Sequence, residues 1–387
     1  MDEIISSYVN DVSIITPNDE YHYFFGYYDM RATAGDQPHL CHRVKFMDRQ
    51  PEADDVAELG YLEDRRFVKF AETTAWNFQQ GAMLQYHPYL RDTVYYNVCE
   101  NGEFKTVTHN IKTGEKKYTS RATAAVSPDG KWGLAVNFGR IFAFRPGYGY
   151  AGCRDEYEGV NAPHEDGVFL VDMESGESKQ ICFYDELTKI GGFNEDEKVL
   201  VNHITFNTES DRFVLLLRNF PQEPQKMWLT SMMVCDLKGN VHTVLKKTYV
   251  SHYYWVDREN ILAHCRADGE KDSMYIINTV NGEYKEYELP YFIETKGGDI
   301  HCNLSPDGNY VIGDGYNRKG YRSLQSYSMK TGVARELMKV KSVRPDNGDI
   351  RCDLHAQFVW GGKYISFDTT QNDRREIALF STDVLDF

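Results

Sequence analysis

The chain has 387 residues, 41% of them hydrophobic and 26% charged, which excludes wholesale disorder and allows a large buried core. Its formal net charge of −15 excludes a general nucleic-acid surface, because a polyanion would be repelled. No apolar run approaches the roughly 20 residues of a membrane helix, and residues 1–5 lack the basic start of a secretory signal, so we expect a cytoplasmic protein without a membrane partner.

The length leaves open two or three domains or one large β architecture. The 14% of aromatic residues favour the second, because aromatic side chains suit pleated sheets. The eight cysteines are scattered without a C-x-x-C pair, which predicts reduced thiols and at most one metal ligand among them.

Strand-like runs separated by turns follow one another along the whole chain. Residues 13–16 are expected to pair with a C-terminal strand, residues 20–70 to form a first unit, and residues 184–190 to form the only short helix. Glycine turns recur roughly 40–60 residues apart, the length of a four-stranded propeller blade, at positions 114, 176, 239, 282 and 332. Between them, Ser-Pro-Asp-Gly turns at 127–130 and 305–308 precede further extended runs.

Five such units, the unit before them and one at about 350–387 make seven. We therefore predict an all-β chain, a single seven-bladed β-propeller domain over residues 1–387, since one blade alone cannot bury its faces. A pair of β-sandwiches is the alternative fold.

Four histidines occupy the same place in successive units, on the strand expected to line the centre of the ring: His203, His252, His301 and His355. Cys352-x-x-His355-x-Gln357 is the sharpest local pattern, and with His301 it predicts a divalent metal site. A thiolate among the ligands favours Zn²⁺, whereas imidazole and amide oxygen suit Mn²⁺ or Ca²⁺. The alternative is that these side chains only pack against one another. Asp314 is expected either as a further metal ligand or as a partner that holds an imidazole in place.

A second group of candidates is cationic and aromatic. Arg140 and Arg145 flank an apolar run, a glycine-rich loop with Tyr148 and Tyr150 follows, and Arg218 ends another apolar strand. Aromatic rings stack on sugar faces and guanidinium groups grip carboxylates, so the pattern indicates a cleft for acidic sugars. Gln80, His252 and Tyr253 are expected to bind the sugar as well. The alternative for most of these rings is packing between blades.

Taken in order, several stretches resemble the oligogalacturonate lyase and ulvan lyase families of seven-bladed propeller polysaccharide lyases. The similar segments are residues 23–29, 79–85, 145–150, 202–206, 301–308 and 352–355. The resemblance implies β-elimination across a uronic acid, with His301, Cys352, His355 and Gln357 as the metal set. Oligogalacturonate lyases carry Q-x-x-H-x-H where this chain has C-x-x-H-x-Q, so a structural Zn²⁺, as in ulvan lyases, fits better than a catalytic Mn²⁺.

The resemblance to oligogalacturonate lyases also implies that Arg218 corresponds to an arginine that acts as the base. The resemblance to ulvan lyases implies that Tyr148 or Tyr150 corresponds to a tyrosine that acts as acid or base. Because a C5 proton is weakly acidic, the carboxylate must first be neutralised, by Arg145, Arg218 or a metal, before His203 or Tyr148 removes that proton.

The leading hypothesis is therefore an enzyme, a carbon–oxygen lyase acting on acidic oligosaccharides that contain uronate. The alternative is a non-catalytic propeller that binds a carbohydrate or a protein around a structural metal. An unrelated hydrolase or isomerase on the same scaffold is a third possibility, although no G-x-S-x-G elbow, H-E-x-x-H helix or phosphate loop is present.

Overall fold

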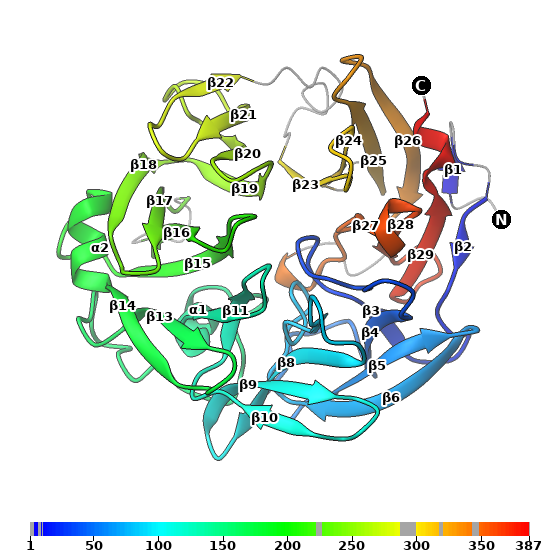
Figure 1. Ribbon diagram of the computed structural model, residues 1–387, viewed down its shortest axis with the longest axis horizontal. Helices are drawn as coiled ribbons and strands as arrows, with labels where there is room; N and C mark the ends of the chain where they lie inside the picture. The colour runs from blue at the N-terminus through cyan, green and yellow to red at the C-terminus, as the bar shows by residue number, and fades with distance from the viewer. Residues whose placement is uncertain are drawn as a thin grey trace.

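Seven antiparallel sheets, here called blades 1 to 7 in chain order, stand in a ring in the described part of the chain (Figure 1). The computed structural model describes residues 4–6, 9, 11–221, 227–286, 299–316, 320–342 and 348–386. The sequence prediction of an all-β seven-bladed propeller is confirmed.

Blades 1 to 3 are built from consecutive strands. Blade 1 contains β3 (His22–Phe24), β4 (His39–Val44), β5 (Ala57–Glu63) and β6 (Arg66–Thr73). Blade 2 contains β7 (Gln85–Tyr86), β8 (Thr93–Glu100), β9 (Glu103–Asn110) and β10 (Lys116–Tyr118). Blade 3 contains β11 (Thr123–Val126), β12 (Trp132–Ala135), β13 (Gly167–Asp172) and β14 (Ser178–Phe183).

Blades 4 and 5 follow the same pattern, and blades 6 and 7 each take one strand from the N-terminal segment. Blade 4 contains β15 (Val199–Phe206), β16 (Arg212–Asn219), β17 (Thr230–Asp236) and β18 (Val241–Thr248). Blade 5 contains β19 (Val250–Trp255), β20 (Asn260–Cys265), β21 (Ser273–Asn278) and β22 (Tyr284–Glu286). Blade 6 contains β23 (Ile300–Leu304), β24 (Tyr310–Gly315), β25 (Tyr321–Ser328), β26 (Ala334–Lys341) and β1 (Ile4–Ser6). Blade 7 contains β27 (Gln357–Val359), β28 (Tyr364–Thr369), β29 (Glu376–Ser381) and β2 (Ser13–Ile14).

The N-terminal segment closes the ring, as predicted from residues 13–16. Ser13 pairs with Leu379 and Ile14 with Ala378, so β2 is the outer strand of a blade otherwise made by the C-terminal part of the chain. Closure removes an exposed sheet edge, which would otherwise be a site for pairing with another chain. The sequence did not predict the pairing of β1 with β26, which makes blade 6 five-stranded.

Two α-helices interrupt the described strands. The predicted helix is confirmed as α2 (Tyr184–Gly191), which is capped by Gly192 with a left-handed φ of 76°. The other, α1 (Phe138–Phe144), was missed, because its apolar run has no amphipathic period. Asn137 begins α1 by accepting a hydrogen bond from the Arg140 amide through its side chain. Short 3₁₀ turns are η1 (Gly348–Ile350), η2 (Trp360–Gly362) and η3 (Thr382–Leu385).

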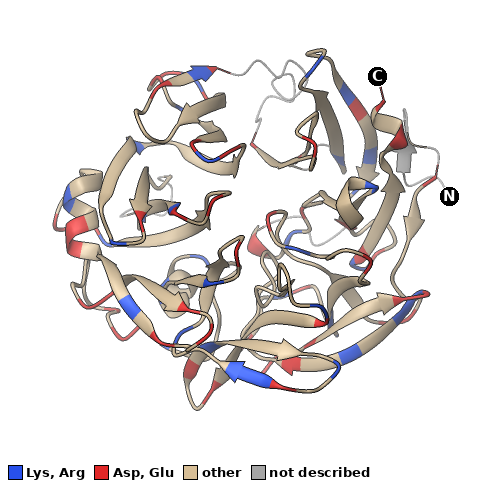
Figure 2. Cartoon of the chain, in the orientation of Figure 1, with Lys and Arg blue, Asp and Glu red and all other residues tan. Residues whose placement is uncertain are grey.

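The recurring glycine turns have the conformation expected of them. Gly114, Gly176, Gly239, Gly282 and Gly332 all have φ between 72° and 86°, a region that favours glycine. Charged residues of both signs are spread around the ring (Figure 2). Within the described ranges, no helix has the length and apolar character needed to cross a bilayer.

Candidate functional site

A cavity of about 470 Å³ lies where the middle of β15, the end of β16 and the first residues of β19 meet loops from the other blades. Six residues predicted from the sequence line it: Gln80, Arg145, Tyr148, His203, Arg218 and His252. Its wall also contains residues that were not predicted: Tyr27, Asn202, Met227, Trp228, Tyr249, Val250, Ser251, Asp299, Tyr316, Gly348, Asp349 and Arg351. We call this space the main cavity.

Arg218 is held rigidly on the wall of the main cavity by β15 and β19. Its two Nη atoms donate to Asn202 Oδ1 and to the carbonyls of Val250 and Ser251, while its buried Nε has no partner among the described residues. Burial, and then the neighbouring Arg145 guanidinium, lower the pKa of Arg218 to about 10. Arg218 therefore presents a positive charge that is incompletely compensated, in a chain whose net charge is −15.

Arg145 and Arg351 add two further guanidinium groups, both anchored by aspartates. Arg145 Nη2 lies 2.7 Å from Asp349 Oδ1, and its guanidinium sits 4.2 Å from the centre of the Tyr148 ring. Arg351 Nη2 donates to the Tyr148 hydroxyl at 3.4 Å and lies 2.8 Å from Asp353 Oδ2. Although burial opposes it, Asp353 raises the pKa of Arg351, so this group stays charged.

The glycine-rich loop divides its two tyrosines between the cavity and the core. Tyr148 lines the main cavity, whereas Tyr150 is fully buried, stacked on Phe138 with ring centres 4.2 Å apart, and its hydroxyl accepts a hydrogen bond from Asn97. Tyr150, which was predicted to be catalytic, therefore packs in the core instead of lining the main cavity, because its ring stacks on Phe138 of α1.

Arg140, predicted to bind substrate, lies in the core instead of the main cavity. Its side chain is fully buried, ion-paired with Asp155 at 3.0 Å, and donates to the carbonyls of Val199, Val160 and Asn161. The side chain turns inward because Arg140 belongs to helix α1 and not to an inner strand. Its donors are taken up by these contacts, which tie α1 to the loop after it and to β15.

The four aligned histidines gather around one ring, Tyr27, in the loop after β3. The centre of the Tyr27 ring lies 5.3 Å from His203, 6.4 Å from His252, 6.1 Å from His301 and 4.9 Å from His355. Burial raises the pKa of the Tyr27 hydroxyl well above its ordinary value. The repeat therefore brings together side chains that are up to 152 residues apart in the sequence because each histidine is near the start of a blade.

The two histidines that line the main cavity, His203 and His252, each contact a carboxylate. His203 Nε2 lies 3.3 Å from Asp29 Oδ2, and His203 Nδ1 is buried without a partner in the described part of the chain. His252 Nδ1 lies 2.7 Å from Asp299 Oδ1, yet burial outweighs this contact and lowers the pKa of His252 to about 4. His252 is therefore neutral at physiological pH.

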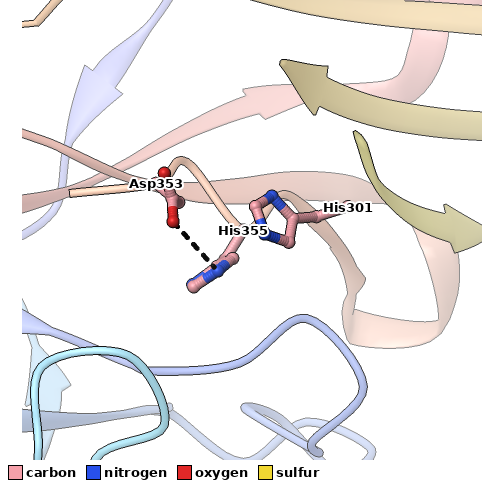
Figure 3. Close-up of side chains that lie close together, drawn as sticks. All are labelled: His301, Asp353 and His355. Carbon is pink, nitrogen blue, oxygen red and sulfur yellow. Dashed lines mark ion pairs between the residues drawn. The ribbon is translucent and has the colours of Figure 1, made fainter. Parts of the chain in front are cut away.

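His301, Asp353 and His355 form a buried cluster (Figure 3), which adjoins the main cavity through the ion pair between Asp353 and Arg351. One nitrogen or oxygen atom from each lies within 4.8 Å of the others. His301 Nδ1 lies 3.0 Å from Asp314 Oδ1, and His355 Nδ1 donates to the Gly26 carbonyl at 2.9 Å. These contacts turn the Nε2 atoms of both histidines inward, where they have no hydrogen-bond partner among the residues described.

The donor set fits a divalent metal ion. Two imidazole nitrogens and one carboxylate are ligands that Zn²⁺ and Mn²⁺ both accept, and partners at the second imidazole nitrogen are typical of metal-bound histidines. The expectation that Asp314 holds an imidazole agrees with its contact to His301. Burial lowers the pKa of His355 to about 3, which keeps that imidazole available as a ligand.

Asp353 takes the place that the sequence pattern predicted for Cys352. The Cys352 thiol points to the Asp353 carbonyl at 3.7 Å, and burial raises its pKa to about 12, which disfavours a thiolate ligand. His355 has a φ of 43° and precedes β27, so the alternation expected to put His355 and Gln357 on one strand face does not apply. Gln357 is buried at the first position of β27, paired with Ser366.

Tyr253 lines a second, smaller cavity of about 180 Å³, together with Asp29, Arg31, Thr205 and Trp255 among others. Its hydroxyl donates to the Val214 carbonyl at 3.1 Å. Tyr253 follows His252 on β19, at the end of an irregularity in the pairing of β19 with β20, and its hydroxyl contacts Thr205 and Val214. Of these two predicted sugar-binding neighbours, only His252 lines the main cavity.

Sequence reasoning missed Arg351, Asp353 and Asp299, although two of them carried a signal. Asp353 is two residues before His355, and Asp299 is two residues before His301. Such i, i+2 acid–histidine pairs repeat in the last blades and mark a polar inner face. Trp228 and Tyr316 carried no comparable pattern, because the fold alone brings their loops to the main cavity.

No protein-family model matches the sequence, and no curated protein matches it significantly. Solved structures match it in fold. A manganese complex of an oligogalacturonate lyase has a TM-score of 0.65 at 14% identity, covering 99% of this chain and 97% of its own. An oligogalacturonate lyase from Vibrio parahaemolyticus has a TM-score of 0.64 at 14% identity, covering 98% and 96%.

The tricorn protease is also similar, with a TM-score of 0.55 and 10% identity over 97% of this chain, but the match spans only 34% of that protein. At these identities the likeness concerns the fold, and propellers carry many functions. The chain is therefore similar over nearly its whole length to the seven-bladed propeller of oligogalacturonate lyases.

Proposed function

We propose that this protein cleaves short oligosaccharides containing uronic acid by β-elimination in the main cavity. The observation that carries the proposal is the pairing of Arg218 and Arg145 with the aromatic faces of Tyr148 and Trp228 around one cavity. Guanidinium groups bind carboxylates and aromatic rings stack on sugars, so the two kinds of group together match an acidic sugar.

Charge balance within the cavity supports an anionic substrate. The wall contains Arg145, Arg218 and Arg351 against Asp299 and Asp349, while the whole chain has a net charge of −15. A local positive potential in a partly buried site attracts an anion more strongly than exposed charges do. Arg218, whose Nε has no partner among the described residues, is the group we assign to the uronate carboxylate.

Two side chains are positioned for proton transfer. When the C5 proton is removed, the electron pair forms the C4–C5 double bond, the C4–O bond breaks, and the leaving oxygen takes up a proton. His203, which contacts Asp29 through Nε2 and whose buried Nδ1 has no partner in the described ranges, is our assignment for the first transfer. The Tyr148 hydroxyl, which accepts a hydrogen bond from Arg351, is our assignment for protonating the leaving oxygen.

We further propose that His301, Asp353 and His355 hold a divalent metal, which when bound supplies positive charge next to the cavity. One fold neighbour was solved in complex with manganese, which supports the proposal that this chain also binds a divalent ion. His252 bridges the cluster and the cavity, since its ring centre is 4.2 Å from that of His301. The residues that line the main cavity position the sugar, and the metal cluster stabilises the cavity wall beside His252.

Ultraviolet spectroscopy tests the proposal, because the unsaturated uronate product absorbs where the substrate does not. The purified full chain is incubated with a panel of uronate oligomers with and without added Zn²⁺ or Mn²⁺. We expect increasing absorbance for at least one oligomer, and a loss of about 100-fold or more in rate for Arg218→Ala. Arg258→Ala, which removes an exposed arginine paired with Asp211, is the matched control and should leave the rate unchanged.

Calorimetry on the same panel separates cleavage from binding alone. Oligomers that bind, lose affinity in Arg218→Ala and never yield absorbance would identify a non-catalytic carbohydrate-binding propeller. A panel with neither binding nor absorbance would overturn both functions.

A further inference from the structure

Cys99 and Cys153 face each other across the junction of blades 2 and 3. Cys99 is the penultimate residue of β8, Cys153 follows the loop after α1, and their sulfur atoms are 3.4 Å apart although 54 residues separate them in the sequence. Both are partly exposed, whereas the other six cysteines are buried. Among the eight cysteines, this is therefore the one pair whose sulfur atoms are close together and whose residues are both accessible to solvent.

We propose that Cys99 and Cys153 are a redox-sensitive pair that forms a reversible disulfide when the protein meets a peroxide. A disulfide has an S–S distance of about 2.0 Å, so the two sulfurs need to approach by only about 1.4 Å. The first thiolate attacks the peroxide to give a sulfenic acid and hydroxide. The second thiol then displaces water and closes the disulfide, so two thiols and one hydrogen peroxide give one disulfide and two waters.

The surroundings of the two thiols indicate which of them reacts first with the peroxide. Burial, and then the hydrogen bond and negative charge of Cys99, raise the pKa of Cys153 to about 12. Cys153 is therefore a poor first nucleophile. We therefore assign the attack on the peroxide to Cys99 and the second step, closure of the disulfide, to Cys153.

The disulfide would reinforce a contact that already exists. Tyr150, three residues before Cys153, accepts a hydrogen bond from Asn97, two residues before Cys99. The same loop presents Arg145 and Tyr148 to the main cavity. The crosslink therefore preserves the shape of the cavity while it restricts the unfolded chain, and its main expected effect is on stability.

Peptide mapping under non-reducing conditions tests the proposal on the folded full chain. After treatment with an equimolar amount of hydrogen peroxide and alkylation of free thiols, mass spectrometry should detect a Cys99–Cys153 crosslink that dithiothreitol reverses. The melting temperature should rise by several degrees on oxidation. In Cys99→Ser both effects should vanish.

Cys235→Ser is the matched control, because Cys182 and Cys235 also interact but are both buried. This variant should keep the Cys99–Cys153 crosslink. Recovery of Cys99 and Cys153 as separately alkylated or over-oxidised residues from folded wild-type protein would overturn the proposal. Since the mapping is done on the wild type, this result is decisive even if Cys99→Ser folds poorly.

Discussion

His203 Nε2 lies 3.3 Å from Asp29 Oδ2, and this contact connects the two cavities. His203 lines the main cavity and Asp29 the smaller one. The carboxylate orients the imidazole so that Nε2 carries the proton and Nδ1 offers its lone pair. Asp29 is therefore a positioning residue for His203.

Asp29→Asn should lower kcat for uronate cleavage by about tenfold or more with a smaller effect on KM, because the amide no longer favours one tautomer. Asp211→Asn, which changes a half-buried aspartate that lines neither cavity, serves as the control. Equal changes in kcat and melting temperature for both variants would contradict a positioning role.

Removing either imidazole of the metal cluster should abolish metal binding. We expect purified His301→Ala and His355→Ala to contain far less Zn²⁺ or Mn²⁺ than wild type by elemental mass spectrometry after equal loading and dialysis. His164→Ala, which changes an exposed histidine, should retain the metal. A wild-type protein with no stoichiometric metal after loading would show that the cluster is only a hydrogen-bonded core.

Tyr148 and Tyr150 provide a matched pair two residues apart. Tyr148→Phe should reduce turnover by about 100-fold or more with little change in unfolding free energy. Tyr150→Phe should leave turnover intact and cost about 1 kcal/mol, since it removes the hydrogen bond from Asn97. Absorbance measures turnover and urea unfolding measures stability. Loss of turnover in Tyr150→Phe but not in Tyr148→Phe would contradict the roles assigned to the two tyrosines.

Arg140→Ala should destabilise the protein by about 3–5 kcal/mol, because it leaves the carboxylate of Asp155 buried and unpaired. Urea unfolding of full-length protein measures the loss. Arg258→Ala, at an exposed ion pair, should change stability by less than about 1 kcal/mol. A stable Arg140→Ala variant that loses only sugar affinity would instead restore Arg140 as a binding residue.

His42 gives the fold an acid-sensitive contact. It is fully buried, accepts a hydrogen bond from the Ala82 amide through Nε2, and burial lowers its pKa to about 4. The unfolded chain binds a proton near pH 6.5 and the folded one does not, so stability falls as pH drops from about 6.5 to about 4, by up to about 3 kcal/mol.

His42→Gln keeps an acceptor without titrating, so its unfolding free energy should depend less steeply on pH across this window than that of wild type. Urea unfolding at several pH values measures the slopes. Parallel slopes for the two proteins would mean that His42 titrates alike in the folded and unfolded states.

The sequence by itself determined the architecture, because the architecture rests on local, repeated signals. Glycines with positive φ end hairpins at blade-length intervals, and residues 13–16 were available to close the ring. The common phase of His203, His252, His301 and His355 followed from the same repeat. Strand periodicity and turn chemistry are properties of neighbouring residues, so they can be read without coordinates.

Only the tertiary structure decided which side chains meet in the loops, where no period governs direction. It directed Tyr148 to the cavity and Tyr150 to the core, put Asp353 in the place predicted for Cys352, and brought Cys99 to Cys153. These outcomes depend on a helix with no amphipathic pattern, on a left-handed residue at His355, and on a contact between two neighbouring blades. Packing between segments far apart in the chain sets all three, and a single sequence does not encode that packing in any local pattern.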